Sequence, residues 1–161
     1  MVNKNKFSLV LIILFVAIIN SVSCASESSV QLQENTSTDR ATIIQMNRFL
    51  SGQLKGLVSS EFGELANYDY TSIRESIEKL LDNTNNILLT SYRESSKEYR
   101  NKCNFLMITV GMKSLLEEID RLDECKEGCS EVQLGKIKEH IKSKYDYLTL
   151  KSSFCSQYLG I

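Results

Sequence analysis

The sequence predicts an all-α protein, an up-down four-helix bundle with a disulfide-stapled C-terminal helical hairpin. Three observations support this prediction: apolar residues recur at helical spacing in four stretches, the 161 residues include no proline, and four cysteines follow an N-terminal leader. Without proline, nothing forces a break in the backbone hydrogen bonding of a helix. Four helices joined by short links favour an up-down bundle.

The first 24 residues have the three-part layout of a secretory signal peptide. Lys4 and Lys6 make the start positive, 7–19 is apolar except for one serine, and small polar residues follow. This apolar run is shorter than the roughly 20 residues that a transmembrane helix needs. We expect cleavage after Cys24 and a secreted, extracellular protein. A bacterial lipid anchor on Cys24 is disfavoured, because the residues before it lack the usual leucine and small alanine or glycine.

The leader contains two of the 19 basic residues and none of the 20 acidic ones, which leaves 17 against 20 and a net charge of −3. This mild charge does not indicate nucleic acid or an anionic membrane as a partner. A domain of this size can bury roughly two thirds of its unfolded surface, which is enough for a core. No second apolar segment has the length of a membrane span, so we expect no membrane association after cleavage.

The stretch 25–38 is polar, and we expect it to be flexible because it has little to bury. It contains the sequon Asn35-Thr36-Ser37, a candidate site for N-glycosylation in a secreted protein. We expect the helical bundle domain to cover 39–161.

The first two helices follow from apolar spacing and capping residues. The first is expected to begin at Asp39, a good N-cap residue, and to end near Gly63. The second opens with Ser72 and has Glu75 three residues later, the spacing of a capping box. The polar stretch 82–86 contains mediocre helix formers rather than helix breakers, so we expect the second helix to continue through it. The two apolar stripes are Ile43, Met46, Leu50, Leu54 and Leu57, and then Ile73, Ile77, Leu80, Leu81, Ile87 and Leu88.

The third and fourth helices form the predicted hairpin. The third is expected to run from Ser95, with Glu98 in capping-box spacing, and the fourth follows a turn around Gly128. The third stripe is Tyr99, Cys103, Leu106, Met107, Val110, Leu115, Ile119 and Leu122. The fourth is Leu134, Ile137, Ile141, Tyr145, Leu148 and Cys155.

Helix geometry chooses among the possible cysteine pairings. Cys103 lies 22 residues before Cys125, about 33 Å along a straight helix, whereas a disulfide needs Cα atoms within roughly 7 Å. Cys103 and Cys155 lie 26 residues before and after Cys129, so they are level in an antiparallel hairpin. We therefore predict the disulfides Cys103–Cys155 and Cys125–Cys129. The rival sequential pairing would require both helices to break near their middles.

Other readings of the cysteines and charged residues are weaker. Zinc is disfavoured by the cysteine spacing, and an exchange-active pair by the acidic surroundings of 125–129. The acids near this turn lack the pattern of an EF-hand, so a solvated acidic turn is favoured over calcium. His140, the only histidine, lies among charged residues and is expected on the surface. We expect no catalytic residues, metal or cofactor.

Two functions from different classes remain. The first is a non-enzymatic interaction protein that binds an extracellular protein partner, as helical cytokines and secreted effectors do. Its candidate binding residues are Tyr68 and Tyr70, in the link between the first two helices, where we expect them to be exposed. The second is a carrier that holds a small apolar ligand in the bundle interior, since Met46, Met107 and Met112 could line an adaptable pocket.

Overall fold

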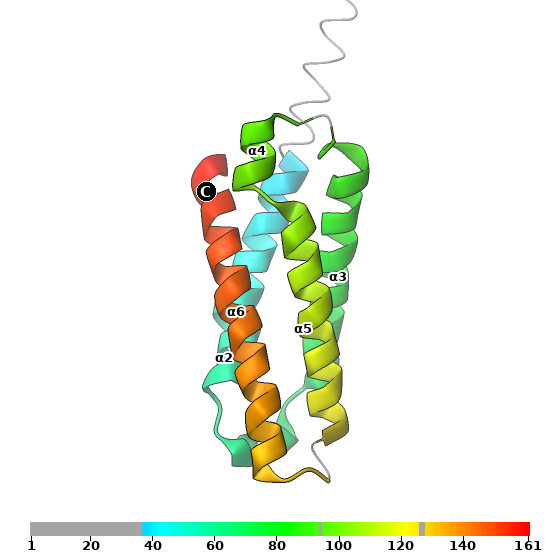
Figure 1. The fold of residues 1–161 in the computed structure, drawn as a ribbon, viewed down its shortest axis with the longest axis vertical. Helices are drawn as coiled ribbons and strands as arrows, with labels where there is room; N and C mark the ends of the chain where they lie inside the picture. Colours follow the sequence, from blue (N-terminus) through cyan, green and yellow to red (C-terminus); the bar gives the residue numbers. More distant parts are fainter. Residues whose placement is uncertain (1–36, 94, 126–127) are drawn as a thin grey trace, which may run out of the picture. The chain divides into compact units, whose positions relative to one another are not determined.

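The computed structural model describes residues 37–161, apart from residues 94, 126 and 127. Every regular element in this part of the chain is a helix (Figure 1). The all-α prediction is therefore confirmed for the described residues.

The N-terminal features lie outside the described residues. They are the leader with its cleavage after Cys24, nearly all of the polar segment 25–38, and the sequon at Asn35. All three stay predictions from the sequence.

Four long helical stretches make up most of the described chain (Figure 1). They are 37–59, which includes a π-helical turn η1 (Leu50–Leu54) and α2 (Lys55–Ser59), then α3 (Tyr70–Thr90), α5 (Phe105–Cys125) and α6 (Glu131–Leu159). Two shorter helices, η2 (Phe62–Asn67) and α4 (Lys97–Lys102), lie in the links. α5 packs against both α3 and α6, and the first helix packs against α6. The predicted stripes of the first two helices are buried, except that Leu88 is partly exposed.

The first helix differs from its prediction at both ends. Asp39 is not the N-cap: residues 37 and 38 are already helical, and the Asp39 carboxylate is buried, where it accepts a hydrogen bond from the Tyr99 hydroxyl. The helix ends at Ser59, because Ser60 has extended backbone. Asp39 finds a partner 60 residues away, and no local pattern could have indicated it.

α3 begins three residues earlier than the predicted capping box, whose N-cap would be Ser72. Asp69 is the N-cap, and its carboxylate accepts a hydrogen bond from the Ser72 backbone at 3.0 Å. The polar stretch 82–86 is helical, as predicted. Thr84 in this stretch is fully buried, and its hydroxyl accepts a hydrogen bond from Thr109 of α5 at 3.0 Å. Tertiary packing therefore holds the weak helix formers in place.

The third predicted helix is in fact two helices. α4 ends at Lys102, and Cys103 has φ −102° and ψ 71°, outside the helical region. The Asn104 side chain then accepts a hydrogen bond from the Met107 backbone at 3.1 Å, the bond that an N-cap residue makes. The expectation of one helix from Ser95 is wrong, because Asn104 starts a new helix with its own phase.

α6 and the hairpin follow the prediction closely. Ser130 and Gln133 form a capping box, and the left-handed Gly160 (φ 69°) ends the helix. The cysteines form the two pairs that the helix geometry predicts, with Cα–Cα distances of 4.4 Å for Cys103–Cys155 and 5.1 Å for Cys125–Cys129. The longer link spans 52 residues and is buried at both sulfurs.

Candidate interaction surface

The first half of α5 exposes three hydrophobic side chains. Leu106, Met107 and Val110 expose 55%, 41% and 54% of their surface. Their predicted place in the core stripe is wrong, because the new helix that starts after Asn104 turns them outward. The core positions belong to their neighbours on the opposite side of the helix, Phe105, Ile108 and Met112.

α6 is apolar on more than one side. Ile141, Leu148 and Cys155 belong to the core. A second stripe recurs every three or four residues along the same helix: Lys144, Tyr147, Lys151, Phe154 and Tyr158. Phe154 exposes 45% of its surface and the neighbouring Leu150 exposes 52%. The spacing of this second stripe can be read from the sequence. The sequence prediction missed it because the core stripe alone was enough to identify the helix.

Two contacts place α5 and α6 against each other. One is the Cys103–Cys155 disulfide. The other is Gly111, where a Cβ atom would lie 3.0 Å from a Leu148 methyl carbon and 3.1 Å from the Tyr147 ring, so these two α6 side chains pack directly against the α5 backbone. Residues 103–111 therefore run antiparallel beside 147–155, at the same level.

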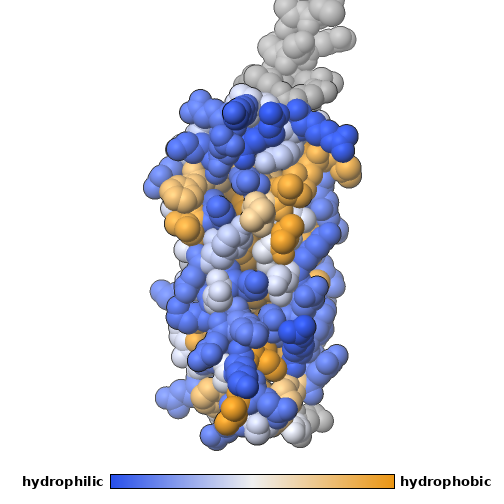
Figure 2. All heavy atoms as spheres, viewed as in Figure 1, coloured by the Kyte–Doolittle hydropathy of each residue, from blue (hydrophilic) through white to orange (hydrophobic). Residues whose placement is uncertain are grey.

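This register brings the exposed side chains of both helices to one level of the hairpin. We call the set the α5–α6 face, and it consists of Leu106, Met107, Val110, Leu150 and Phe154. In Figure 2, hydrophobic side chains are exposed over the upper parts of α5 and α6, with hydrophilic side chains around and between them. Exposed apolar side chains that lie near one another often mark binding sites on proteins in water.

The charged residues along this face are lysines. Residues 101–114 and 147–161 contain three lysines, Lys102, Lys113 and Lys151, and no Asp or Glu. None of the three takes part in an ion pair with another described residue. The Lys151 ammonium lies 5.5 Å from the centre of the Tyr147 ring, in cation–π geometry. The face is thus apolar with a positive margin.

The two tyrosines expected to be exposed are not both available. Tyr70 is 2% exposed, and its hydroxyl donates a 2.7 Å hydrogen bond to the Leu65 carbonyl. Burial is the main cause that raises the pKa of Tyr70 to about 12. Tyr68 is partly buried against the core, and its hydroxyl lies 2.8 Å from where a Cβ on Gly56 would be. The expected exposure is therefore wrong for Tyr70, which is a core residue.

The acidic end of α5 is engaged within the chain. Arg74 of α3 contacts Asp120 at 2.8 Å and Asp123 at 3.3 Å. Glu118 is 7% exposed, and its carboxylate lies 3.1 Å from Arg121 and 3.5 Å from the imidazole of His140, whose side chain is mostly exposed. No group of three or more acidic, histidine or cysteine side chains in the described part is arranged to hold a metal ion.

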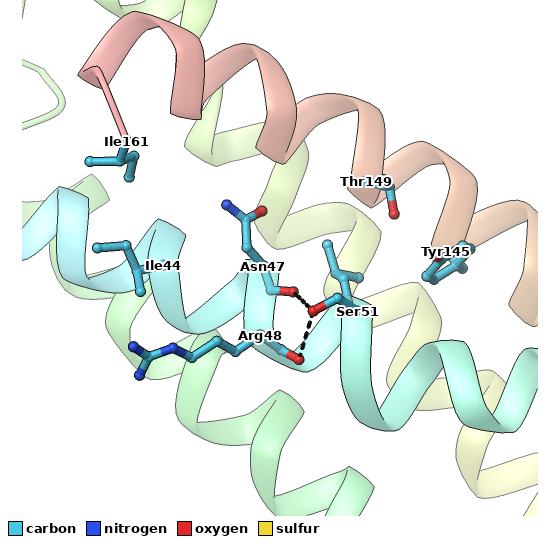
Figure 3. A pocket seen from close by; sticks show the side chains of 8 residues that line it. Ile44, Asn47, Arg48, Ser51, Tyr145, Thr149 and Ile161 are labelled. Atoms are coloured by element: carbon cyan, nitrogen blue, oxygen red, sulfur yellow. Dashed lines mark hydrogen bonds between the residues drawn. The ribbon is translucent and has the colours of Figure 1, made fainter.

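A groove of about 380 Å³ lies between the first helix and α6 (Figure 3). Ile44, Leu50 and Ile161 supply apolar lining. Two of its polar side chains are paired within the chain: Ser51 donates to the Asn47 backbone at 2.7 Å, and the Asn47 amide bonds two serines of α6. The three methionines proposed for a ligand pocket do not line it; Met46 and Met112 are fully buried, and Met107 is exposed.

A cluster of aromatic rings closes the end of the bundle around α4. Tyr99 packs within 6.4 Å of the rings of Tyr92 and Phe105, and 5.9 Å from the ring of Tyr158. Its hydroxyl donates to Asp39, whose other carboxylate oxygen is buried with no hydrogen-bond partner among the described residues. Burial raises the pKa of Asp39, partly offset by the Tyr99 hydrogen bond. Burial in this cluster therefore makes the carboxylate of Asp39 easier to protonate than an exposed one.

Comparison of the chain with protein-family models, curated proteins and solved structures gave no match. Among the helices of the described residues, none is long and apolar enough to cross a membrane.

Proposed function

We propose that this chain is a secreted, non-enzymatic interaction protein, cytokine-like or effector-like, that binds an extracellular protein through its α5–α6 face. Its architecture in this proposal is an up-down four-helix bundle with a disulfide-stapled hairpin. The observation that carries the proposal is the exposure of five hydrophobic side chains at one level of two adjacent helices. Leaving such side chains in water is unfavourable, and a partner that covers them gains their burial free energy.

Secretion is supported by the leader and by the paired cysteines. Disulfides persist in oxidising compartments and are rare in the cytosol, where thiols are kept reduced. The buried Cys103–Cys155 pair closes a long loop, as in stapled secreted domains. The two independent features, one at each end of the chain, favour the same compartment.

The contacts that hold α5 and α6 together favour binding without a rearrangement of the two helices. The Cys103–Cys155 disulfide joins the two helices at one end of the face, and the close approach at Gly111 joins them at the other. A surface held in its bound shape loses little conformational entropy when a partner docks. We therefore expect the face to bind as a rigid unit.

Site-specific photo-crosslinking tests this proposal. A photoreactive amino acid replaces Val110 in the α5–α6 face or, as a matched control, Val132, which is an exposed valine in the first turn of α6. The labelled protein is applied to cells of its source, irradiated and analysed by mass spectrometry. We expect one protein adduct from position 110 that excess unlabelled protein suppresses, and none from position 132. Equal adducts at both positions, or none at either, would contradict the proposal.

A carrier of a small apolar ligand is the second candidate, and the groove beside the first helix favours it, since ligand sites usually have volumes of about 300–1,000 Å³. None of the three methionines predicted to line a ligand pocket lines this groove, which counts against the carrier. Native mass spectrometry of protein purified from its source separates the two candidates. Extra mass that is lost on denaturation indicates a carried ligand, whereas a bare monomer mass, apart from any glycan, favours the interaction protein.

A further inference from the structure

We propose that the partner of the α5–α6 face is an amphipathic α-helix with an apolar side and acidic flanks, which lies along the two helices as a third one. This inference rests on the proposed function and names the chemistry of the partner. It combines the shape of the face, the spacing of its side chains and the sign of its charge.

The spacing of side chains on α6 suits a helical partner. Leu150 and Phe154, the exposed hydrophobic residues on this part of α6, lie four residues apart, about one turn of a helix. Leu106 and Val110 are spaced in the same way on α5. The tyrosines of the second stripe pack within the chain, Tyr147 against Gly111 and Tyr158 against the ring of Tyr99. Each helix therefore offers about one exposed apolar turn to a partner helix.

The shape of the face also suits a helix. Leu106, Met107 and Val110 border it on α5, while Leu150 and Phe154 border it on α6. The packing of Tyr147 and Leu148 against Gly111 holds α5 and α6 side by side, so a third helix can contact both at once. Amphipathic helices bind such surfaces through apolar residues spaced three and four apart.

The charge of the face predicts acidic flanks on the partner. Lys113 follows Val110 by three residues on α5, Lys151 lies between Leu150 and Phe154 on α6, and Lys102 precedes Leu106 by four residues. The nearest acids along the helices are Glu98, Glu117 and Asp146, and Asp146 is paired with Lys142 at 2.6 Å. The lysines can therefore pair with carboxylates from outside the chain. Complementary charges of this kind set the orientation and the rate of association.

An anionic membrane would also supply an apolar phase and negative charges, but the position of the exposed side chains favours a helix. The apolar side chains lie on the sides of two adjacent helices and not at a protruding tip that could enter a bilayer. With a net charge of −3 after leader removal, the chain also lacks the overall positive charge that attracts proteins to anionic surfaces.

The test uses the oxidised protein and two designed 18-residue helical peptides. Both peptides carry the same leucine stripe; one has glutamates on its flanks and the other has lysines at the same positions. Affinity is measured by fluorescence anisotropy at low salt, and the site is located by NMR chemical-shift changes. We expect the glutamate peptide to bind at least about tenfold more tightly, with shift changes at Leu106, Val110 and Phe154.

Charge reversal makes the test specific. The double variant K113E/K151E should reverse the preference in favour of the lysine peptide, while K79E/K136E, which makes the same change of net charge at exposed positions outside the face, should leave it unchanged. Circular dichroism confirms that both variants are folded. An unchanged preference in K113E/K151E, or shift changes outside the face, would overturn the inference.

Two further outcomes separate this inference from the proposed function. If neither peptide binds while a crosslink still forms at position 110, the partner is not an acidic helix, and only this inference fails. If phosphatidylserine vesicles bind the protein and shift the same NMR signals while neither peptide does, a membrane is the partner, and both proposals fail.

Discussion

The two halves of α5 belong to one helix but differ in their charge and in the exposure of their hydrophobic side chains. The half from 105 to 114 contains one charged residue, Lys113, and exposes three hydrophobic side chains. The half from 115 to 125 contains five acids and one arginine, and its apolar residues are buried or partly buried. The first half lies beside the long-range disulfide, and the second ends at the local one.

The difference lies in where each half finds its partners. Three of the five carboxylates of the acidic half have ion-pair partners within the chain, because Arg74 of α3 contacts two of them and Arg121 contacts a third. The apolar half has buried partners on one side only. Within the chain nothing described covers its other side, which is why we assign it to binding. The following predictions test this contrast, from the largest expected effect to the smallest.

The two disulfides should differ in what they contribute to stability. Replacing Cys103 and Cys155 together with alanine should lower the free energy of unfolding by about 4 kcal/mol, because the link closes 52 residues. Replacing Cys125 and Cys129 should cost only about 2 kcal/mol, because that link closes a short loop. Urea unfolding of the oxidised variants measures both. Equal losses would show that the two ends of the hairpin are equally constrained.

Gly111 should tolerate no larger side chain. Gly111→Leu should lower the free energy of unfolding by about 2–3 kcal/mol, because the new atoms collide with Tyr147 and Leu148 across the α5–α6 contact. Gly52→Leu is the matched control, since no other heavy atom lies within 4 Å of a Cβ there. The control should be neutral or stabilising. A comparable loss at both sites would mean that the close approach does not matter.

The ion pairs of the acidic half of α5 should contribute modestly to the free energy of unfolding. Arg74→Ala should lower the free energy of unfolding by about 1 kcal/mol, because the guanidinium is partly buried between Asp120 and Asp123. Lys142→Ala removes the more exposed pair with Asp146 and should cost less. The Arg74 effect should shrink in high salt, which screens such pairs. An effect that salt leaves unchanged would indicate packing and not charge.

Asp39 should produce a small dependence of stability on pH. Because the folded-state pKa is raised, the folded protein binds the proton more tightly than the unfolded chain does. Stability from this group is fully present below the unfolded pKa near 3.8 and is lost as the pH rises through the folded pKa. Asp39→Asn, which stays neutral, should therefore gain stability relative to the original chain as the pH rises above 3.8. A stability difference between the two proteins that does not change with pH would contradict the burial of the Asp39 carboxylate.

The smallest effect on stability is expected in the α5–α6 face itself. Val110→Ala should change the free energy of unfolding by less than about 0.5 kcal/mol, because the side chain is exposed in the free protein. Ile108→Ala, two residues away and fully buried, should cost about 2–5 kcal/mol. Thermal unfolding of both variants checks the phase of α5. A large loss at Val110 would place it in the core, as the periodicity alone predicts.

Much of the fold was predictable from the sequence by itself. Apolar spacing identified the long helical stretches and the buried stripes of the first two, because a helix repeats every 3.6 residues whatever its neighbours are. The cysteine pairing was also predictable, since equal spacing on either side of a turn brings Cys103 and Cys155 level at the open end of a hairpin. These features depend on distances along the chain.

Only the tertiary structure decided which apolar side chains of α5 face water. A break at Cys103 and Asn104 shifts the phase of the helix, and a sequence without proline gives little local signal of it. The burial of Asp39 and Tyr70 was equally invisible, because each finds a partner that packing supplies. Periodicity describes one helix at a time, whereas the α5–α6 face exists only once two antiparallel helices lie in register.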